Sequence, residues 1–172
     1  MVISPDDARA LQHLADIRCT YFGGKPTGAH AMVSARNSPA AINLNNSEPL
    51  GFKLFFYFTR NEYFSNEVLE KTYYYKPDTV NDTAQLKYEK AVGCSISWKE
   101  GKNLTAPGPN DQGGWKSFFA FFSPKILPSK AELLKLSNEE FLELLQEIEG
   151  DMQCGEDIRD EVCLFVNCPR VF

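Results

Sequence analysis

The sequence predicts an α+β fold in which an antiparallel sheet of about four strands is backed on one face by helices. Strand-like segments fill the first two thirds of the 172 residues, and helix-like segments fill the last third. Strands followed by helices are typical of an antiparallel sheet with helices on one side. The length and the proportions, 43% hydrophobic and 24% charged, indicate one globular domain over residues 1–172.

A short helix and a strand are expected in residues 1–22. Ser4 can cap the helix, Pro5 suits its first position, and the two aspartates that follow favour the positive end of a helix. Residues 17–22 then change to a β-like pattern. Residues 23–49 are rich in Gly, Ala, Ser, Asn and Pro without periodicity, which predicts a mobile loop.

The rest of the sheet is predicted within residues 50–105. The segment 52–58, FKLFFYF, is dense in aromatic residues that favour strands, and 68–75, VLEKTYYY, is expected to be the next strand. In 94–99, CSISWK, apolar and polar residues alternate, which is typical of a half-buried strand in an antiparallel sheet.

An acidic helical layer is predicted over residues 117–172, after a Pro/Gly-rich loop at 106–116. The layer begins with SFFAFFSP, residues 117–124, whose phenylalanines recur at helical spacing. Large exposed apolar patches are uncommon on soluble monomers, so a helix that packs its phenylalanines on the sheet is favoured over an exposed recognition patch.

Two capping boxes follow, one at Ser129 and one at Ser137, each with a glutamate three residues later. The second begins the helix with the strongest pattern, and a further helix is expected over residues 156–165. The helix that begins at the Ser137 capping box is predicted to have a buried stripe at positions i, i+3, i+4 and i+7. These residues are Phe141, Leu144, Leu145 and Ile148.

The net charge of −5 is unevenly distributed. Residues 129–162 contain eleven acidic and three basic residues, whereas the remainder of the chain is net positive. Such an asymmetry indicates a charged partner, and an acidic segment favours a basic one. No basic stripe suited to nucleic acid is visible, so direct nucleic-acid binding is not expected.

No catalytic or nucleotide-binding motif appears, and we do not expect an enzyme or a cofactor. No apolar run approaches the length of a membrane span, and the N-terminus lacks the pattern of a signal peptide. The five cysteines are therefore expected to be reduced thiols. A zinc site built from Cys154, Cys163, Cys168 and a histidine is the alternative, although these spacings match no common site.

Five stretches, in order, resemble the nucleosome assembly protein family, including its SET-like branch. They are DDARALQHLADIRCTYF (6–22), NEYFSNEVLEKTYYY (61–75), GCSISWKEGKNLT (93–105), SFFAFFSP (117–124) and GEDIRDEV (155–162). The resemblance covers nearly the whole chain. It implies the family's "earmuff" domain, an antiparallel sheet backed by helices that carry an acidic surface.

The resemblance also implies a histone chaperone that promotes nucleosome assembly and moves between nucleus and cytoplasm. The alternative within the same family is a SET-like adaptor or inhibitor that binds a phosphatase or a transport receptor. Family members form homodimers through a long N-terminal helix, and this sequence shows only a short one before its first strand. The acids expected to bind core histones are Glu139, Glu140, Glu143, Glu147, Glu149, Asp151, Glu156, Asp157, Asp160 and Glu161.

Overall fold

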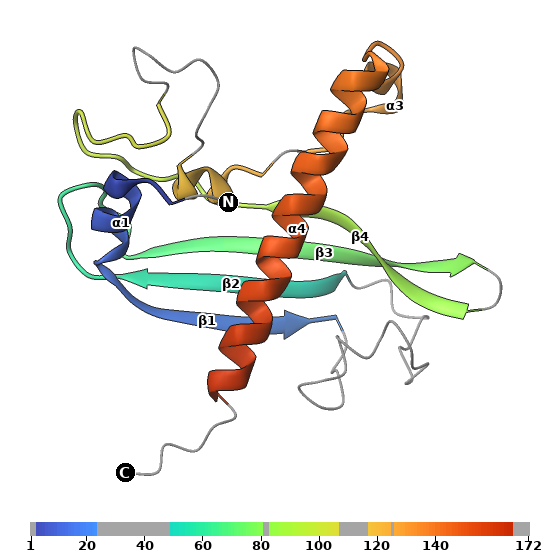
Figure 1. The fold of residues 1–172 in the computed structure, drawn as a ribbon. Coiled ribbons are helices and arrows are strands. Elements are labelled where there is room, and N and C mark those ends of the chain that lie inside the picture. The colour runs from blue at the N-terminus through green and yellow to red at the C-terminus, as the bar shows by residue number, and fades with distance from the viewer. Residues whose placement is uncertain (1–2, 24–48, 81–82, 107–116, 125, 167–172) are drawn as a thin grey trace.

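The sheet has four strands in the order β1-β2-β3-β4, and every neighbouring pair is antiparallel (Figure 1). The strands are β1 (Leu14–Phe22), β2 (Leu50–Phe58), β3 (Val68–Val80) and β4 (Thr83–Val92). The computed structural model describes residues 3–23, 49–80, 83–106, 117–124 and 126–166. The loops predicted at 23–49 and 106–116 therefore lie almost wholly outside the described residues.

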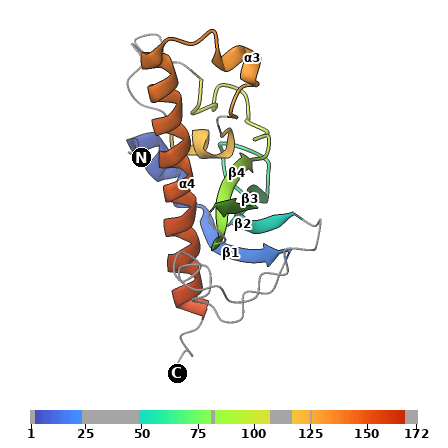
Figure 2. The same cartoon turned by 90° about the vertical axis from the view of Figure 1, so that its right-hand side faces the viewer.

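The helices are α1 (Pro5–Leu11), the 3-10 helix η1 (Phe118–Phe122), α3 (Lys130–Leu133) and α4 (Asn138–Val166). Viewed from the side, α4 lies on one face of the sheet (Figure 2). This arrangement confirms the predicted α+β class with helices on one side of an antiparallel sheet. The prediction of a separate helix over 156–165 is wrong, because α4 runs unbroken through 29 residues. Gly150 and Gly155 lower helix propensity there without ending the helix.

The core lies between the sheet and its helical cover. Alternate residues of β2 are buried, among them Phe52, Leu54 and Phe56, and they point toward the helices. The rings of Phe121 and Phe122 in η1 lie edge-on to Phe56, with centroids 5.9 and 5.2 Å away. The prediction that SFFAFFSP packs beneath the sheet is confirmed, in a 3-10 helix whose four phenylalanines are all buried.

The predicted strand at 94–99 is wrong. The strand that pairs with the outer edge of β3 is β4, and after Val92 the chain leaves the sheet. Only one isolated bridge, between Trp98 and Phe64, is formed by this segment. The alternation in its sequence is nevertheless reflected in its burial, since Cys94, Ile96 and Trp98 all pack against the core. Alternating polarity therefore indicated which side chains face the core, but not whether the backbone pairs in a sheet.

Asp7 joins the N-terminal helix to η1. The Ser4 hydroxyl accepts a hydrogen bond from the Asp7 N–H, so the predicted capping of α1 by Ser4 is confirmed. The Asp7 carboxylate in turn accepts hydrogen bonds from Ser4, from the Ser117 hydroxyl and from the Phe118 backbone N–H. Asp7 itself is fully buried. Burial alone would raise the pKa of this carboxyl, but the hydrogen bonds from Ser117, Ser4 and Phe118 outweigh it and lower the pKa.

Gly155 allows α4 to lie directly on β3. A Cβ at this position would be 2.2 Å from Cζ of Tyr73, whose ring is fully buried and stacked on Phe52 with centroids 4.8 Å apart. The Tyr73 hydroxyl donates a hydrogen bond to the Asp151 carbonyl, one turn earlier in α4, at 3.0 Å. The glycine of the GEDIRDEV stretch therefore sets how closely the helix approaches the sheet.

Two glycine replacements in α4 should have opposite effects. Gly155→Ala should lower the free energy of unfolding by about 1–3 kcal/mol, because the new methyl group displaces a buried ring. Gly150→Ala is the matched control, since nothing lies within 4 Å of its added Cβ, and it should raise stability by up to about 1 kcal/mol. Urea unfolding followed by circular dichroism measures both. Equal effects of the two replacements would show that the close approach at Tyr73 is not a constraint.

Replacing Asp7 with Asn should produce a pH-dependent loss of stability. The folded-state pKa of Asp7 lies below its ordinary value of 3.8, so its stabilisation is complete above that pH and disappears as pH falls through the folded pKa. Hydrogen bonds to charged groups contribute about 1.5–3 kcal/mol, which is the loss expected at pH 7. Denaturant unfolding between pH 7 and pH 2.5 should show the two proteins converging in acid. A constant difference across this range would contradict the assignment.

Candidate functional site

The ten predicted acids all lie on α4, but they fall into an exposed set and a half-buried set. Half-buried are Glu147, Asp151, Glu156 and Asp160. Exposed are Glu139, Glu140, Glu143, Glu149, Asp157 and Glu161. The helix therefore turns only part of its acidic complement to solvent.

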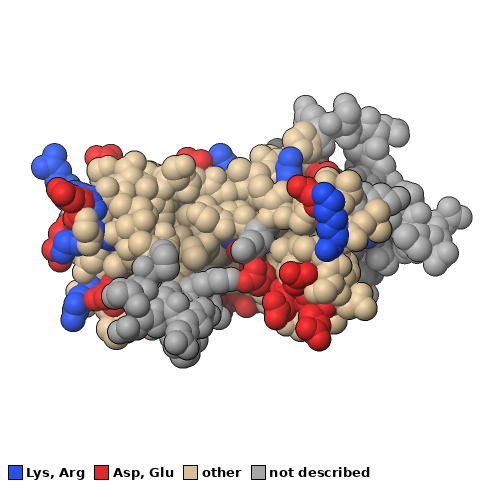
Figure 3. Space-filling model, turned by 90° about the horizontal axis from the view of Figure 1, so that it is seen from above, with Lys and Arg blue, Asp and Glu red and all other residues tan. Residues whose placement is uncertain are grey.

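Four of the exposed acids form a stripe along α4. With roughly 100° between successive residues of a helix, Glu139, Glu143, Asp157 and Glu161 fall within about 40° of one another. The buried Ile148 is on the opposite side, toward the sheet. In the view from above, the Asp and Glu atoms gather in a patch on the side of the molecule where α4 lies (Figure 3). We call these four residues the acidic stripe.

Glu140 has a local structural role at the start of α4. Its carboxylate accepts hydrogen bonds from the Ser137 backbone N–H and hydroxyl, at 2.8 and 2.9 Å. The Ser137 hydroxyl accepts one from the Glu140 N–H in return, so the predicted capping box is confirmed. These hydrogen bonds lower the pKa of Glu140. Any replacement of Glu140 would thus change both surface charge and helix capping.

Asp151 forms an ion pair inside the protein rather than on its surface. Its partner is Lys71 of β3, a side chain with no solvent exposure whose Nζ lies 3.6 Å from the centroid of the Phe121 ring. Burial lowers the pKa of Lys71 and raises that of Asp151, and the charge of each partner opposes the other's shift. Among the described residues, Oδ2 of Asp151 is buried without a hydrogen-bond partner.

Glu156 and Asp160 flank a buried arginine on the sheet side of α4. Arg159 is only 4% exposed, and its guanidinium lies 4.9 Å from the centroid of the Phe52 ring. It forms ion pairs with Asp160 at 2.7 Å and with Glu156 at 3.7 Å. Glu156 also accepts a hydrogen bond from the Tyr75 hydroxyl at 2.9 Å. Much of the charge in GEDIRDEV therefore attaches the helix to the sheet.

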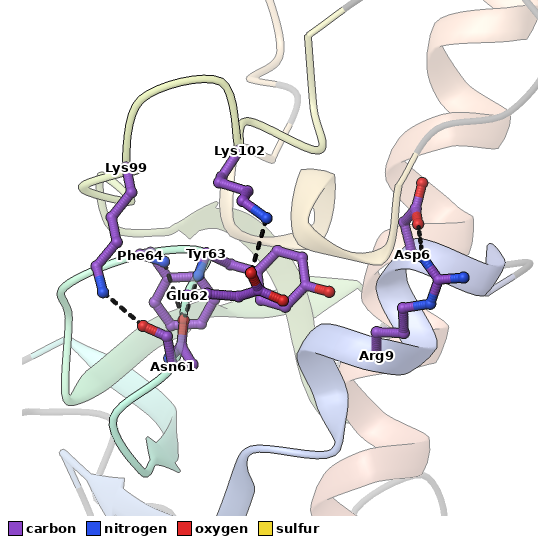
Figure 4. Close-up of polar contacts among 8 residues, drawn as sticks. All are labelled: Asp6, Arg9, Asn61, Glu62, Tyr63, Phe64, Lys99 and Lys102. Atoms are coloured by element: carbon purple, nitrogen blue, oxygen red, sulfur yellow. Dashed lines mark hydrogen bonds and ion pairs between the residues drawn. The ribbon is translucent and has the colours of Figure 1, made fainter.

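The motifs NEYFS (61–65) and WKEGK (98–102) contact each other (Figure 4). Oδ1 of Asn61 accepts hydrogen bonds from the backbone N–H groups of Tyr63 and Phe64, both at 2.9 Å. Lys99 donates to the Asn61 carbonyl, and Lys102 pairs with Glu62 at 2.8 Å. These contacts fix the turn that directs Phe64 into the core, so NEYFS and WKEGK act together in the fold. Nothing in the sequence alone had indicated that these two motifs pair.

The sheet face turned away from α4 carries cations over aromatic rings. Arg18 lies 4.9 Å from the ring centroid of Tyr57, Lys53 lies 5.5 Å from Phe55, and Lys90 lies 5.2 Å from Tyr74. Strand pairing places these six residues, which come from all four strands, on one face. The acidic stripe is therefore confined to the helical side of the molecule.

No group of three or more His, Cys, Asp or Glu side chains within the described ranges could hold a metal ion. Cys163 and Cys168 of the zinc alternative lie where side chains are not described. No described helix has the length and apolarity needed to cross a membrane.

A four-stranded antiparallel sheet with one long acidic helix on a single face defines an α+β domain whose distinctive exposed chemistry is acidic. The chain belongs to the nucleosome assembly protein family, whose model matches residues 1–164. A nucleosome assembly protein of Schizosaccharomyces pombe is 32% identical over 190 residues, with 97% of this chain and 41% of the relative covered. Nucleosome assembly protein 1;2 of rice is 37% identical over 131 residues, with 67% of this chain and 34% of the relative covered.

Among solved structures, nucleosome assembly protein 1 of Plasmodium knowlesi superposes with a TM-score of 0.53 at 26% identity. The superposition covers 95% of this chain and 57% of the other. The chain spans less than half the length of the two curated relatives. The predicted family is confirmed, and these similarities cover the sheet as well as most of the helical layer.

The ion pair between Lys71 and Asp151 should be strongly coupled. Lys71→Met or Asp151→Leu alone leaves one charge buried without a partner, which typically costs about 3–5 kcal/mol of stability. The double replacement should recover most of that loss, because no buried charge remains. A double-mutant cycle by chemical denaturation measures the coupling. If the losses of stability in the two single variants simply add in the double variant, the two side chains do not stabilise each other, and the predicted coupling is wrong.

Proposed function

We propose that this chain binds core histones through the acidic stripe of α4 and acts as the histone-binding part of a nucleosome assembly factor. The observation that carries this is the one-sided stripe of Glu139, Glu143, Asp157 and Glu161 on an unbroken helix. Membership of the nucleosome assembly protein family supports a histone chaperone role in general, and the family is not known for enzymes. The proposed function is therefore one of binding.

The mechanism follows from competition between two anionic surfaces for one cationic protein. Histones are rich in Lys and Arg and bind DNA phosphates without regard to sequence. A folded acidic surface occupies those cations, which releases incorrect histone–DNA contacts while leaving the correct assembly available. Each exposed ion pair contributes only about 0–1 kcal/mol, so affinity depends on many pairs and on long-range steering. Binding should consequently weaken as salt is added.

The acids of α4 differ in role according to their contacts within the fold. Asp151, Glu156 and Asp160 form ion pairs with Lys71 or Arg159, so we assign them to attachment of α4. Glu140 belongs to the capping box. Glu149 is exposed about a quarter turn around the helix from the acidic stripe and remains part of the predicted surface.

The decisive variant changes Glu139, Glu143 and Glu161 to Gln. Its matched control changes Glu67, Glu89 and Glu100 to Gln, which are exposed acids outside α4 and alter net charge equally. Each of the purified core-histone pairs is titrated against each protein at low and at high salt. We expect the α4 variant to lose at least about tenfold in affinity at low salt, and the control to lose less than about threefold.

The outcomes discriminate between functions. Equal losses in the two variants would show that only net charge matters and would overturn the assignment to α4. Histone binding that is absent from the wild-type chain would overturn the proposed function. Tight binding with no salt dependence would favour a defined apolar contact, as expected of the adaptor alternative.

A further inference from the structure

The long helix extends beyond the sheet that it covers. At about 1.5 Å per residue, the 29 residues of α4 span roughly 43 Å, whereas four strands spaced about 4.8 Å apart are roughly 14 Å across between their outer members. The side-chain contacts from α4 to the sheet begin near Ile148 and continue through Asp151, Gly155 and Arg159. In Figure 1 the N-terminal half of α4 projects past the strands, with α3 beside its end.

The apolar pattern of α4 does not stop where the sheet does. Phe141, Leu144 and Leu145 continue the stripe that buries Ile148, but Phe141 is 36% exposed and was wrongly predicted to be buried. Its neighbour Leu142 is 56% exposed. The sequence pattern is that of a covered helix, whereas this part of the helix has no sheet beneath it.

Exposed apolar side chains are concentrated in this part of the chain. Seven large apolar residues are exposed among those described, and five of them fall between residues 126 and 142. Leu134, in the turn after α3, is 81% exposed. The other four are Ile126, Leu127, Phe141 and Leu142. We call these five residues the apolar tip, and such clustering on a soluble protein marks an interaction surface.

Charge complementarity indicates the chemistry of the partner. The segment 129–149, which contains most of the apolar tip, has six acids and two lysines. Glu140 and Glu143 adjoin Phe141 and Leu142 in the sequence, Glu139 lies about one helical turn before Leu142, and all three glutamates are exposed. We propose that the apolar tip docks an amphipathic basic helix. This proposal rests on the proposed function and names the element of the partner that the chain recognises. The apolar face of this helix covers Leu134, Phe141 and Leu142, and its flanking Lys or Arg side chains pair with the glutamates.

The same charges disfavour a second copy of this chain as the occupant. Two apolar tips facing each other would bring two sets of glutamates together, and like charges across an interface oppose association. A basic helix meets both the apolar and the acidic requirement. The apolar contact also supplies affinity that exposed ion pairs lack, because burial of a leucine side chain does not weaken with salt.

Synthetic peptides test the apolar contact separately from histone binding. The first probe is a Leu/Lys helix of about five turns with its leucines on one face. The second has the same composition with the leucines dispersed around the helix, and therefore the same charge. We expect the full chain to bind the first peptide at least about tenfold more tightly than the second, and to retain that binding at high salt. Equal affinities for the two peptides would overturn the proposal.

A pair of variants locates the contact. Leu134→Gln with Leu142→Gln removes apolar area at exposed positions, and it should reduce binding of the first peptide to the level of the second. Ile3→Gln with Val92→Gln is the matched control, since these residues are 54% and 45% exposed and lie elsewhere. Circular dichroism and thermal unfolding verify that each variant folds. Retained affinity in the Leu134/Leu142 variant would overturn the proposal, as would an equal loss in the control.

Two further outcomes separate this inference from the proposed function. If the wild-type chain binds the amphipathic peptide but no histone pair, the apolar tip is supported and the histone assignment fails. If it binds histone pairs, and the Leu134/Leu142 variant binds them unchanged at high salt, the proposed function stands and the apolar tip is not its anchor. Light scattering on the free protein tests self-association, and dimers abolished by the leucine replacements would contradict the chosen occupant.

Discussion

The close contact of α4 with β3 is the constraint on which the rest of this domain depends. Gly155 brings the helix backbone against the Tyr73 ring, and this closeness places the Asp151 carboxylate beside the Lys71 ammonium. The ion pair is itself costly, because both charges are removed from water. Its geometry nevertheless specifies where along the helix the sheet must lie, since sliding α4 by one turn would leave two buried charges apart. With the helix fixed in this way, Cys154 and Ile158 of α4 pack against the single core that the phenylalanines of β2 and η1 form.

Fixing α4 in this position also divides its acids by function. The side that faces the sheet uses Asp151, Glu156 and Asp160 to hold Lys71 and Arg159. The opposite side carries the acidic stripe, whose four carboxylates are exposed. A helix can carry this much negative charge in a stable domain because part of it is neutralised internally. The remaining charge is then displayed on a rigid element, so a cationic partner meets a fixed pattern rather than a flexible tail.

Most of the fold could be predicted from the sequence because its main signals are local. The capping boxes, the aromatic strand 52–58 and the spacing of SFFAFFSP each depend on neighbours within a few residues. Prediction failed where the answer depended on distant partners. Residues 94–99 alternate as a strand does, but β4 already occupies the edge of β3. Nothing in the sequence around Asp151 distinguishes it from the exposed Asp157, because the difference is made by Lys71, 80 residues away.

The overhang of α4 shows why a predicted core position can become a binding position. Periodicity specifies which side of a helix is apolar, but the extent of the sheet decides how much of that side is covered. Ile148 and Phe141 have equivalent places in the pattern and differ in burial, 6% against 36% exposed. An apolar stripe longer than its own core is stable only if the exposed part has little area or a partner elsewhere. Because the exposed part here carries glutamates at its margins, the partner that satisfies both features is cationic and amphipathic.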